Sequence, residues 1–197
     1  MKLTKADILS LFAIAFGWSS LLFVLENQYV LSVTFLLLAF ICDLFDGVIA
    51  RKFKEEASSW GAVLDSLADT LLYLLVPLLF ARSVWQFPMW TFYVLSLGPI
   101  IAGFFRLARF SMVGLKKDDK GIYYEGLIVV HQALFLLFGF AIYQSLQFWG
   151  NVFLIGSMII IPPLMLFTSI KTRKPNVNTS LAIAGIFFLY LYATILN

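Results

Sequence analysis

Charged residues are scarce in this chain of 197 residues, and cysteine is nearly absent. Only 13% of the residues are charged, about half the usual share in a soluble domain, and 61% are hydrophobic. This balance excludes an ordinary soluble domain and a disordered chain. The single Cys42 permits no disulfide within the chain, which excludes a disulfide scaffold. The composition therefore indicates an integral membrane protein.

Long apolar runs follow one another along the chain. A helix needs about 20 apolar residues to cross a bilayer. On that basis the sequence predicts an all-α fold, a polytopic membrane helical bundle that forms one transmembrane domain over residues 1–197. Proline kinks a membrane helix but is tolerated there, and Pro77, Pro99, Pro162 and Pro163 fall within the runs. The seven predicted spans are Ile8–Leu25, Tyr29–Ala50, Gly61–Ala81, Trp90–Val113, Glu125–Leu146, Trp149–Ile170 and Thr179–Leu196.

The basic residues are distributed unevenly between the two ends of these spans. Arg82 alone falls at one end, and all the others fall at the end that carries the N-terminus: Lys2, Lys5, Arg51, Lys52, Lys54, Arg106, Arg109, Lys116, Lys117, Lys120, Lys171, Arg173 and Lys174. Lysine and arginine accumulate on the cytoplasmic side of membrane proteins. We therefore expect the N-terminus and the polar loops in the cytoplasm, and the chain in a bacterial or archaeal cell membrane.

Four aspartates lie inside the apolar spans, where an ionised side chain is costly and marks a functional site. Asp43 and Asp46 are three residues apart, so they share one face of a helix. Gly61, Asp65 and Asp69 are each four residues apart and form a stripe on the next helix. The two helices are joined by a short loop, so we expect them to present paired carboxylates to each other.

Clustered carboxylates in a medium of low dielectric need compensating positive charge. Hard divalent cations prefer oxygen ligands, and two of them can clamp the oxygens of a transferring phosphoryl group. The alternative is that the acids form structural ion pairs with Arg106 and Arg109. Asp43 lies eight residues before Arg51, or roughly 12 Å along the helix axis, so reagents dissolved in water could reach the cluster.

The order of these residues is specific. It reads Asp43-x-x-Asp46-Gly47-x-x-Ala50-Arg51, followed by Gly61-x-x-x-Asp65-x-x-x-Asp69. This pattern resembles the signature of the CDP-alcohol phosphotransferase family, membrane enzymes that make phospholipid headgroups. Nine residues separate Arg51 from Gly61, one more than is usual, but the addition falls in the loop and leaves the stripe in phase.

The resemblance implies that an alcohol displaces CMP from CDP-diacylglycerol. It implies two divalent ions, Mg²⁺ or Mn²⁺, held by Asp43, Asp46, Asp65 and Asp69, and it makes Asp69 the base that takes the proton of the acceptor hydroxyl. The residues that would contact the CDP moiety are Asp46, Gly47, Ala50, Arg51 and Gly61. It also implies a six-helix core and a homodimer among membrane lipids, and we expect no nucleic-acid partner.

The sequence indicates the acceptor alcohol less clearly than it indicates the CDP-linked substrate. Phe105-Arg106-Leu107-Ala108-Arg109-Phe110 resembles an element of the phosphatidylserine synthase branch, so L-serine is the first candidate. Arg106 and Arg109 could bind its carboxylate, or the phosphate of glycerol 3-phosphate, or they could merely mark the cytoplasmic end. The sequence departs from that branch at Ala13 and over 126–130, so glycerol 3-phosphate is kept as the alternative acceptor.

Several other interpretations stay open. Tyr123, Tyr124 and Glu125 could line an acceptor pocket or form an interfacial group, and His131 is expected to be a buried, hydrogen-bonded residue. A covalent aspartyl intermediate is a variant of the mechanism. A divalent-cation transporter is a different class of function, but its ion site would lie near the midplane at a repeat interface, and the sequence shows no internal repeat.

Overall fold

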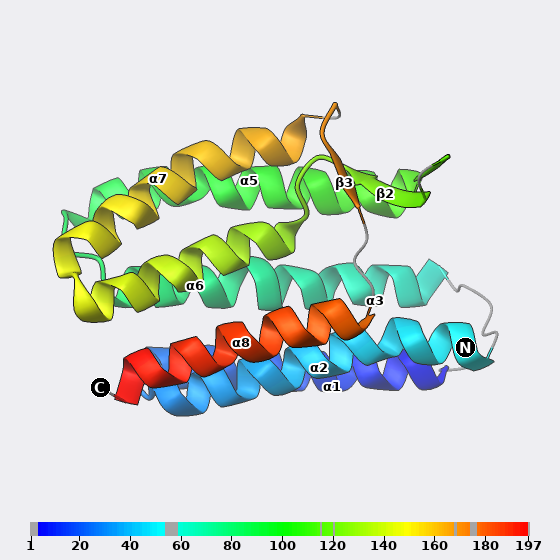
Figure 1. The fold of residues 1–197 in the computed structure, drawn as a ribbon, viewed down its shortest axis with the longest axis horizontal. Helices are drawn as coiled ribbons and strands as arrows, with labels where there is room; N and C mark the ends of the chain where they lie inside the picture. The colour runs from blue at the N-terminus through cyan, green and yellow to red at the C-terminus, as the bar shows by residue number, and fades with distance from the viewer. Residues whose placement is uncertain are drawn as a thin grey trace.

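The computed structural model describes residues 4–53, 59–114, 116–119, 121–167, 169–173 and 177–196. The described chain is predominantly helical, and six of its helices are long and apolar enough to cross a membrane. The predicted polytopic all-α bundle is thereby confirmed (Figure 1). The helices are α1 (Lys5–Leu25), α2 (Tyr29–Phe53), α3 (Ser59–Asp69), η1 (Thr70–Leu75), α4 (Val76–Ser83), α5 (Met89–Val113), α6 (Val129–Ser145), α7 (Gln147–Leu166) and α8 (Val177–Leu196).

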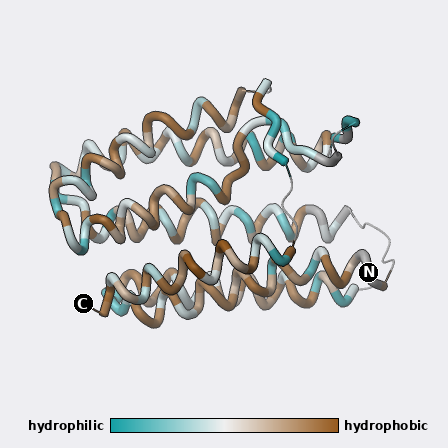
Figure 2. The backbone as a smooth tube through the Cα atoms, viewed as in Figure 1, coloured by the Kyte–Doolittle hydropathy of each residue, from teal (hydrophilic) through white to brown (hydrophobic). Residues whose placement is uncertain are grey.

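The helices share one long axis, and their hydrophobic residues extend over most of their length (Figure 2). The helix formed by α3, η1 and α4 is central, because it packs against α1, α2, α5 and α6. In Figure 1, α1, α2 and α8 lie on one side of it, and α5 and α7 lie on the other. The N-terminus and the strands lie at one end of the bundle, and the C-terminus lies at the opposite end.

Residues near the two ends of α1 explain how it begins and how it pairs with α2. Thr4 caps the helix, because its side chain accepts a hydrogen bond from the Asp7 N–H while the Asp7 carboxylate accepts one from the Thr4 N–H. At the far end, Ser20 and Ser32 exchange side-chain hydrogen bonds of 2.8–2.9 Å between α1 and α2. Small hydroxyl side chains of this kind let membrane helices approach closely.

The third span is not a regular α-helix throughout. Between α3 and α4 the segment η1 is π-helical, and the N–H of Val76 donates to the carbonyl of Leu71, five residues earlier. Pro77 follows at once; it has no N–H, and in a regular α-helix its ring would clash with the carbonyl of Tyr73. The proline therefore explains why the wider turn occurs at this point.

A small sheet was not predicted. It consists of β1 (Lys116–Asp118), β2 (Gly121–Glu125) and β3 (Lys171–Arg173), antiparallel in the order β1-β2-β3. The sheet joins the α5–α6 connection to the α7–α8 connection. Two predicted spans are therefore too long. The helix α6 begins at Val129 rather than Glu125, and α7 ends at Leu166 rather than Ile170. At 17 residues, α6 is shorter than the six long helices.

Candidate active site

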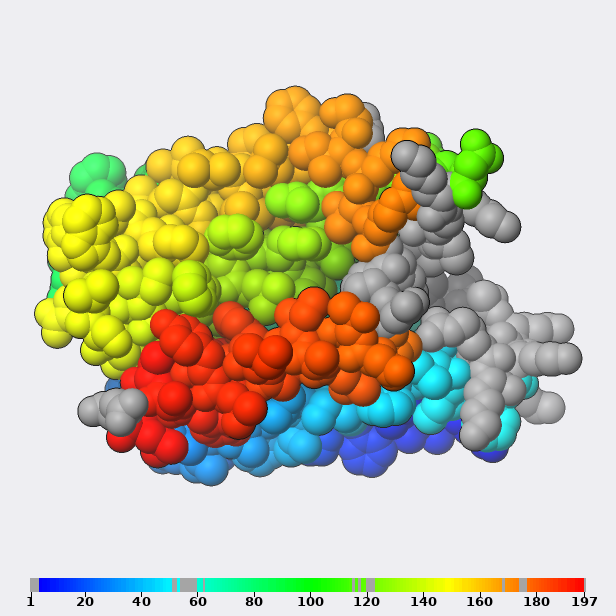
Figure 3. All heavy atoms as spheres, in the orientation of Figure 1, coloured from blue at the N-terminus to red at the C-terminus, as the bar shows by residue number. Residues whose placement is uncertain are grey.

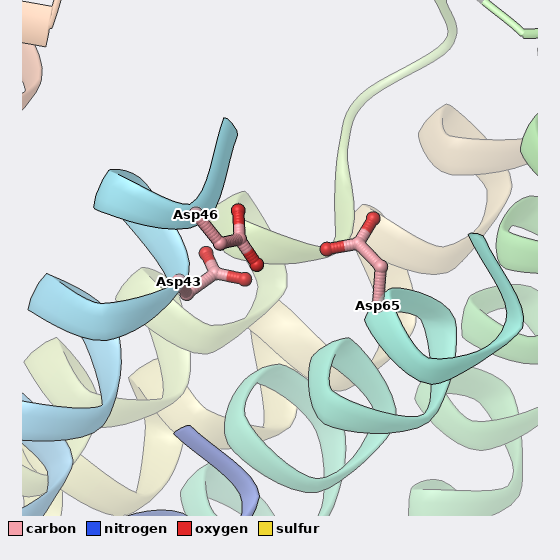
Figure 4. Close-up of side chains that lie close together, drawn as sticks. All are labelled: Asp43, Asp46 and Asp65. Atoms are coloured by element: carbon pink, nitrogen blue, oxygen red, sulfur yellow. The ribbon is translucent and has the colours of Figure 1, made fainter. Parts of the chain in front are cut away.

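Three aspartates meet where α2 faces α3. Asp43 and Asp46 lie on the same face of α2, and Asp65 points toward them from α3 (Figure 4). One carboxylate oxygen from each residue lies within 4.8 Å of the others. The helical spacing explains part of the arrangement, since positions three apart on α2 share a face. The structure thus brings three of the four predicted carboxylates together.

The donor set of this cluster fits a divalent cation. Carboxylate oxygens are the ligands that Mg²⁺ and related hard cations prefer. Asp69 lies one turn beyond Asp65 and outside the group of three, although it lines the same cavity. The structural ion pairs considered from the sequence are absent from the described part of the chain, because neither Arg106 nor Arg109 lies within salt-bridge distance of an aspartate.

Two hydroxyl groups donate hydrogen bonds to the aspartates of α2. The Tyr73 hydroxyl donates to Asp43 Oδ2 over 2.7 Å, and the Ser10 hydroxyl donates to Asp46 Oδ2 over 2.7 Å. Both donors are buried. Neither residue was predicted from the sequence. No local pattern marks either donor, because Tyr73 reaches Asp43 through the π-helical turn η1 and Ser10 lies on a different helix.

A cavity of about 480 Å³ extends from the aspartates into the bundle. Its polar wall contains all four aspartates together with Gly47 and Arg106. Its apolar wall runs between α2, α6 and α8, and on the face shown in Figure 3 α8 covers this region by packing on both α2 and α6. The apolar lining includes Leu36, Phe40, Leu134, Leu137, Ile183, Ala184, Phe187 and Phe188. The cavity is therefore charged at one end and apolar along its length.

Of the remaining predicted nucleotide contacts, one is among the described residues that line this cavity. Gly47 lines it, whereas Ala50 on α2 and Gly61 on α3 are not among its described lining residues. The backbone of Arg51 belongs to α2, and its side chain lies outside the described part of the structure. The α2 positions after Asp46 thus lead from the cavity toward the end of the bundle that carries the N-terminus.

The two arginines of α5 have different surroundings. Arg106 is 4% exposed, lines the cavity, and has its guanidinium carbon 5.2 Å from the ring centres of both Phe110 and Tyr124. In the described part of the chain it makes no hydrogen bond to protein. A buried guanidinium that faces a cavity without a protein acceptor is suited to an anionic ligand.

Arg109 instead binds backbone carbonyls. Its guanidinium donates to the carbonyls of Met165 and Leu166 at the end of α7, over 3.1 Å each, and to that of Glu125 at the end of β2, over 2.8 Å. These carbonyls lack helical or sheet partners at the ends of their elements. Arg109 therefore holds the end of α7 to the end of β2. The guanidinium of Arg109 thus has backbone partners, whereas that of Arg106 faces the cavity.

The three residues of β2 that were candidates for an acceptor pocket also differ. Tyr123 lies beneath the ammonium group of Lys171, which is 4.7 Å from its ring centre, and Glu125 forms a 2.7 Å ion pair with Lys116. Tyr124 alone lines the cavity. Burial raises the pKa of Tyr124, so its hydroxyl stays protonated at neutral pH and can donate a hydrogen bond.

His131 lines the cavity from α6. Its Nδ1 lies 3.3 Å from the carbonyl of Ile128, so the expected hydrogen-bonded histidine is confirmed. The ring is partly buried rather than fully enclosed. Thr172 and Arg173 of β3 line the same end of the cavity, and Arg173 is paired with Asp118 at 3.3 Å.

Comparison with known proteins identifies one family. The family model described as CDP-alcohol phosphatidyltransferase matches residues 3–195. Among curated proteins, the chain is similar to a protein of Drosophila melanogaster named "Probable cardiolipin synthase (CMP-forming)", with 36% identity over 69 residues. The match covers 34% of this chain and 20% of the Drosophila protein, so the similarity involves about one fifth of that relative's length.

Proposed function

Because the chain belongs to the CDP-alcohol phosphatidyltransferase family, we propose that it transfers the phosphatidyl group of CDP-diacylglycerol to the hydroxyl group of an alcohol and releases CMP. The protein is an integral membrane transferase of phospholipid biosynthesis. The observation that carries the proposal is the cavity, which joins a three-carboxylate cluster to an apolar channel. A lipid that bears a pyrophosphate matches both parts, because its headgroup is charged and its acyl chains are apolar.

The cation-binding residues in this proposal are Asp43, Asp46, Asp65 and Asp69, which would hold two Mg²⁺ or Mn²⁺ ions. Bound ions would neutralise the pyrophosphate and stabilise the negative charge on the departing phosphate. Three of the carboxylates already lie within reach of one another, which supports the assignment. The CDP moiety would contact Asp46 and Gly47 in the cavity and the neighbouring positions Ala50, Arg51 and Gly61.

We assign the general base to Asp69. In the reaction its carboxylate accepts the proton of the acceptor hydroxyl, the hydroxyl oxygen bonds to the phosphorus of the phosphatidyl group, and the bond from that phosphorus to CMP breaks. The position of Asp69 supports this role, because it lines the cavity one turn beyond Asp65. A direct displacement of this kind needs no aspartyl intermediate, so it predicts inversion of configuration at phosphorus.

The acceptor in this proposal is an alcohol that also carries an anionic group. The buried guanidinium of Arg106 faces the cavity and lies over the ring of Tyr124, which lines the same cavity. A carboxylate or a phosphate would complete the hydrogen bonds of this arginine. L-Serine is our first candidate and glycerol 3-phosphate is the alternative. The name of the Drosophila relative adds a third candidate, a phospholipid with a glycerol headgroup.

One assay tests the proposed function and the acceptor together. Purified protein in detergent or nanodiscs is incubated with CDP-diacylglycerol, Mg²⁺ or Mn²⁺, and each of L-serine, glycerol 3-phosphate and phosphatidylglycerol. We expect metal-dependent CMP release and a new phospholipid with one of the three acceptors. Absence of CMP release with all of them, by protein that is folded and binds Mn²⁺, would contradict the transfer reaction.

We also propose that the aspartate-bearing end of the bundle faces the cytoplasm and that two copies associate. The basic residues at that end support the orientation. The homodimer is a prediction from the family. Because a relative occurs in Drosophila, the family does not confine the chain to a bacterial or archaeal membrane.

A further inference from the structure

The π-helical turn η1 follows Asp69 directly and alters the direction of the next side chains. An α-helix advances about 100° per residue, so four residues overshoot a full turn by about 40°. Asp65, Asp69 and Tyr73 are each four residues apart, and a regular helix would carry Tyr73 progressively away from the face of the aspartates. A π-turn contains more residues per turn, so the step from Asp69 to Tyr73 rotates less.

The result is visible in the contacts of Tyr73. Its side chain is 5% exposed, and its hydroxyl crosses to α2 and donates to Asp43 Oδ2 over 2.7 Å. The Ser10 hydroxyl of α1 donates to Asp46 Oδ2 over the same distance. The two aspartates of α2 are thus each held by a hydroxyl group from a different neighbouring helix.

We propose that Tyr73 and Ser10 are positioning residues that fix the carboxylates of Asp43 and Asp46 in the orientation that binds the divalent cations. This inference rests on the proposed function. The terminal torsion of an aspartate is broad, so a free carboxylate rotates readily. A short hydrogen bond to one oxygen fixes that rotation before any cation arrives. Hydrogen-bond partners of this kind are worth about 10–100-fold in metal affinity.

The alternative is that the two hydroxyls only satisfy their own hydrogen-bonding requirement inside the bundle. The chain offers a matched control for each of them. Tyr192 on α8 shares a hydrogen bond with Thr34 on α2, and Ser20 on α1 bonds to Ser32 on α2, both away from the aspartates. Tyr192→Phe and Ser20→Ala therefore remove the same kind of helix–helix hydrogen bond without touching a carboxylate.

The experiment measures Mn²⁺ binding by electron paramagnetic resonance on purified protein without nucleotide, for wild type, Tyr73→Phe, Ser10→Ala and the two controls. We expect the Mn²⁺ dissociation constant to rise about 10–100-fold in Tyr73→Phe and in Ser10→Ala and to stay unchanged in the controls. In CMP-release assays, the Mn²⁺ concentration for half-maximal activity should rise in parallel. The KM for CDP-diacylglycerol, measured at saturating Mn²⁺, should stay close to the wild-type value.

The outcomes separate the two proposals. Unchanged Mn²⁺ affinity in Tyr73→Phe and Ser10→Ala, or an equal loss in the controls, overturns the positioning role and leaves the proposed function intact. Wild-type protein that binds no Mn²⁺ overturns the cation site and this inference with it, whereas absence of CMP release overturns the proposed function. Should Tyr73→Phe fail to fold, Ser10→Ala decides the question, because it removes only one oxygen atom from a different helix.

Discussion

Individual residues of the cavity have distinct tasks although several are of the same type. Asp43, Asp46 and Asp65 form one group, whereas Asp69 stands apart from it in the same cavity. The arginines of α5 divide in the same way, because Arg106 faces the cavity and Arg109 binds backbone carbonyls. Identical side chains can therefore be assigned different roles on the basis of their partners, and each assignment predicts a different effect of substitution.

Replacement of Asp69 by asparagine tests the assigned base. An amide of the same shape cannot accept the hydroxyl proton, so we expect the turnover of Asp69→Asn to fall by about 10²–10⁴-fold. Binding of CDP-diacylglycerol should remain close to wild type, as measured by equilibrium binding of the radiolabelled lipid. Wild-type turnover in this variant would show that another group takes the proton.

Replacement of Arg106 tests the acceptor site. Loss of a charge-assisted hydrogen bond costs about 1.5–3 kcal/mol, so Arg106→Ala should raise the KM for the acceptor by roughly 10–100-fold. The KM for CDP-diacylglycerol should change much less, and the steady-state kinetics of both substrates give the comparison. Arg109→Ala is the matched control, since it should lower thermal stability instead. An equal rise in both KM values would place Arg106 in the nucleotide site or in the structure.

At the scale of elements, the site depends on junctions between helices and strands. The α7–α8 connection contributes β3 to the sheet, and Arg109 holds the end of α7 to the end of β2. Gly126 lies at this junction with a φ of +78°, where a side chain is disfavoured, and an added Cβ would clash with the carbonyl oxygen of Met165. The backbone here requires glycine for two reasons.

Gly126→Ala should accordingly destabilise the protein. The strained backbone alone costs about 1–3 kcal/mol, and the close carbonyl adds to that cost. Thermal unfolding in detergent, followed by circular dichroism, provides the measurement. Gly114→Ala is the comparison, since Gly114 also has a positive φ, of +69°, but no atom of the described residues lies within 4 Å of the added Cβ. A loss of thermal stability no larger than that of Gly114→Ala would show that the Met165 carbonyl can shift to accommodate the added Cβ.

The sequence was sufficient to predict the elements whose residues follow a regular spacing. Apolar runs predicted the long helices, and the three- and four-residue spacings predicted that α2 and α3 would present aspartates to each other. The small sheet was missed because three-residue strands carry little signal and β2 pairs with a strand far along the chain. The contacts of Tyr73 and Ser10 depend on a π-turn and on a separate helix, and neither can be seen in a local pattern.

At the scale of the whole molecule, the site and most of the described basic residues lie at one end of the bundle, with Arg82 at the other. The structure places the last turns of α2, the start of α3, the strands and the start of α1 together at that end, as the alternation of spans predicts (Figure 1). CDP-linked substrates would then enter from the side where most of the basic residues lie. The apolar wall of the cavity extends from that end into the bundle.

Labelling of introduced cysteines tests the proposed orientation. In a Cys42→Ala background, Asp119→Cys and Arg82→Cys place single thiols at exposed positions on opposite ends of the molecule. In intact bacteria that express the protein, a membrane-impermeant maleimide should label the Arg82→Cys variant, and it should label the Asp119→Cys variant only after permeabilisation. The reverse pattern would place the site outside the cytoplasm.

The central claim is that α2 and α3 combine their carboxylates to hold divalent cations. Mn²⁺ titration of purified wild type, Asp43→Asn and Asp65→Asn, followed by electron paramagnetic resonance, tests it most directly, because each variant alters only one of the two helices. We predict tight binding by wild type and a large loss of affinity in each variant, together with loss of CMP release. Wild-type Mn²⁺ affinity in either variant would contradict a site shared between the two helices.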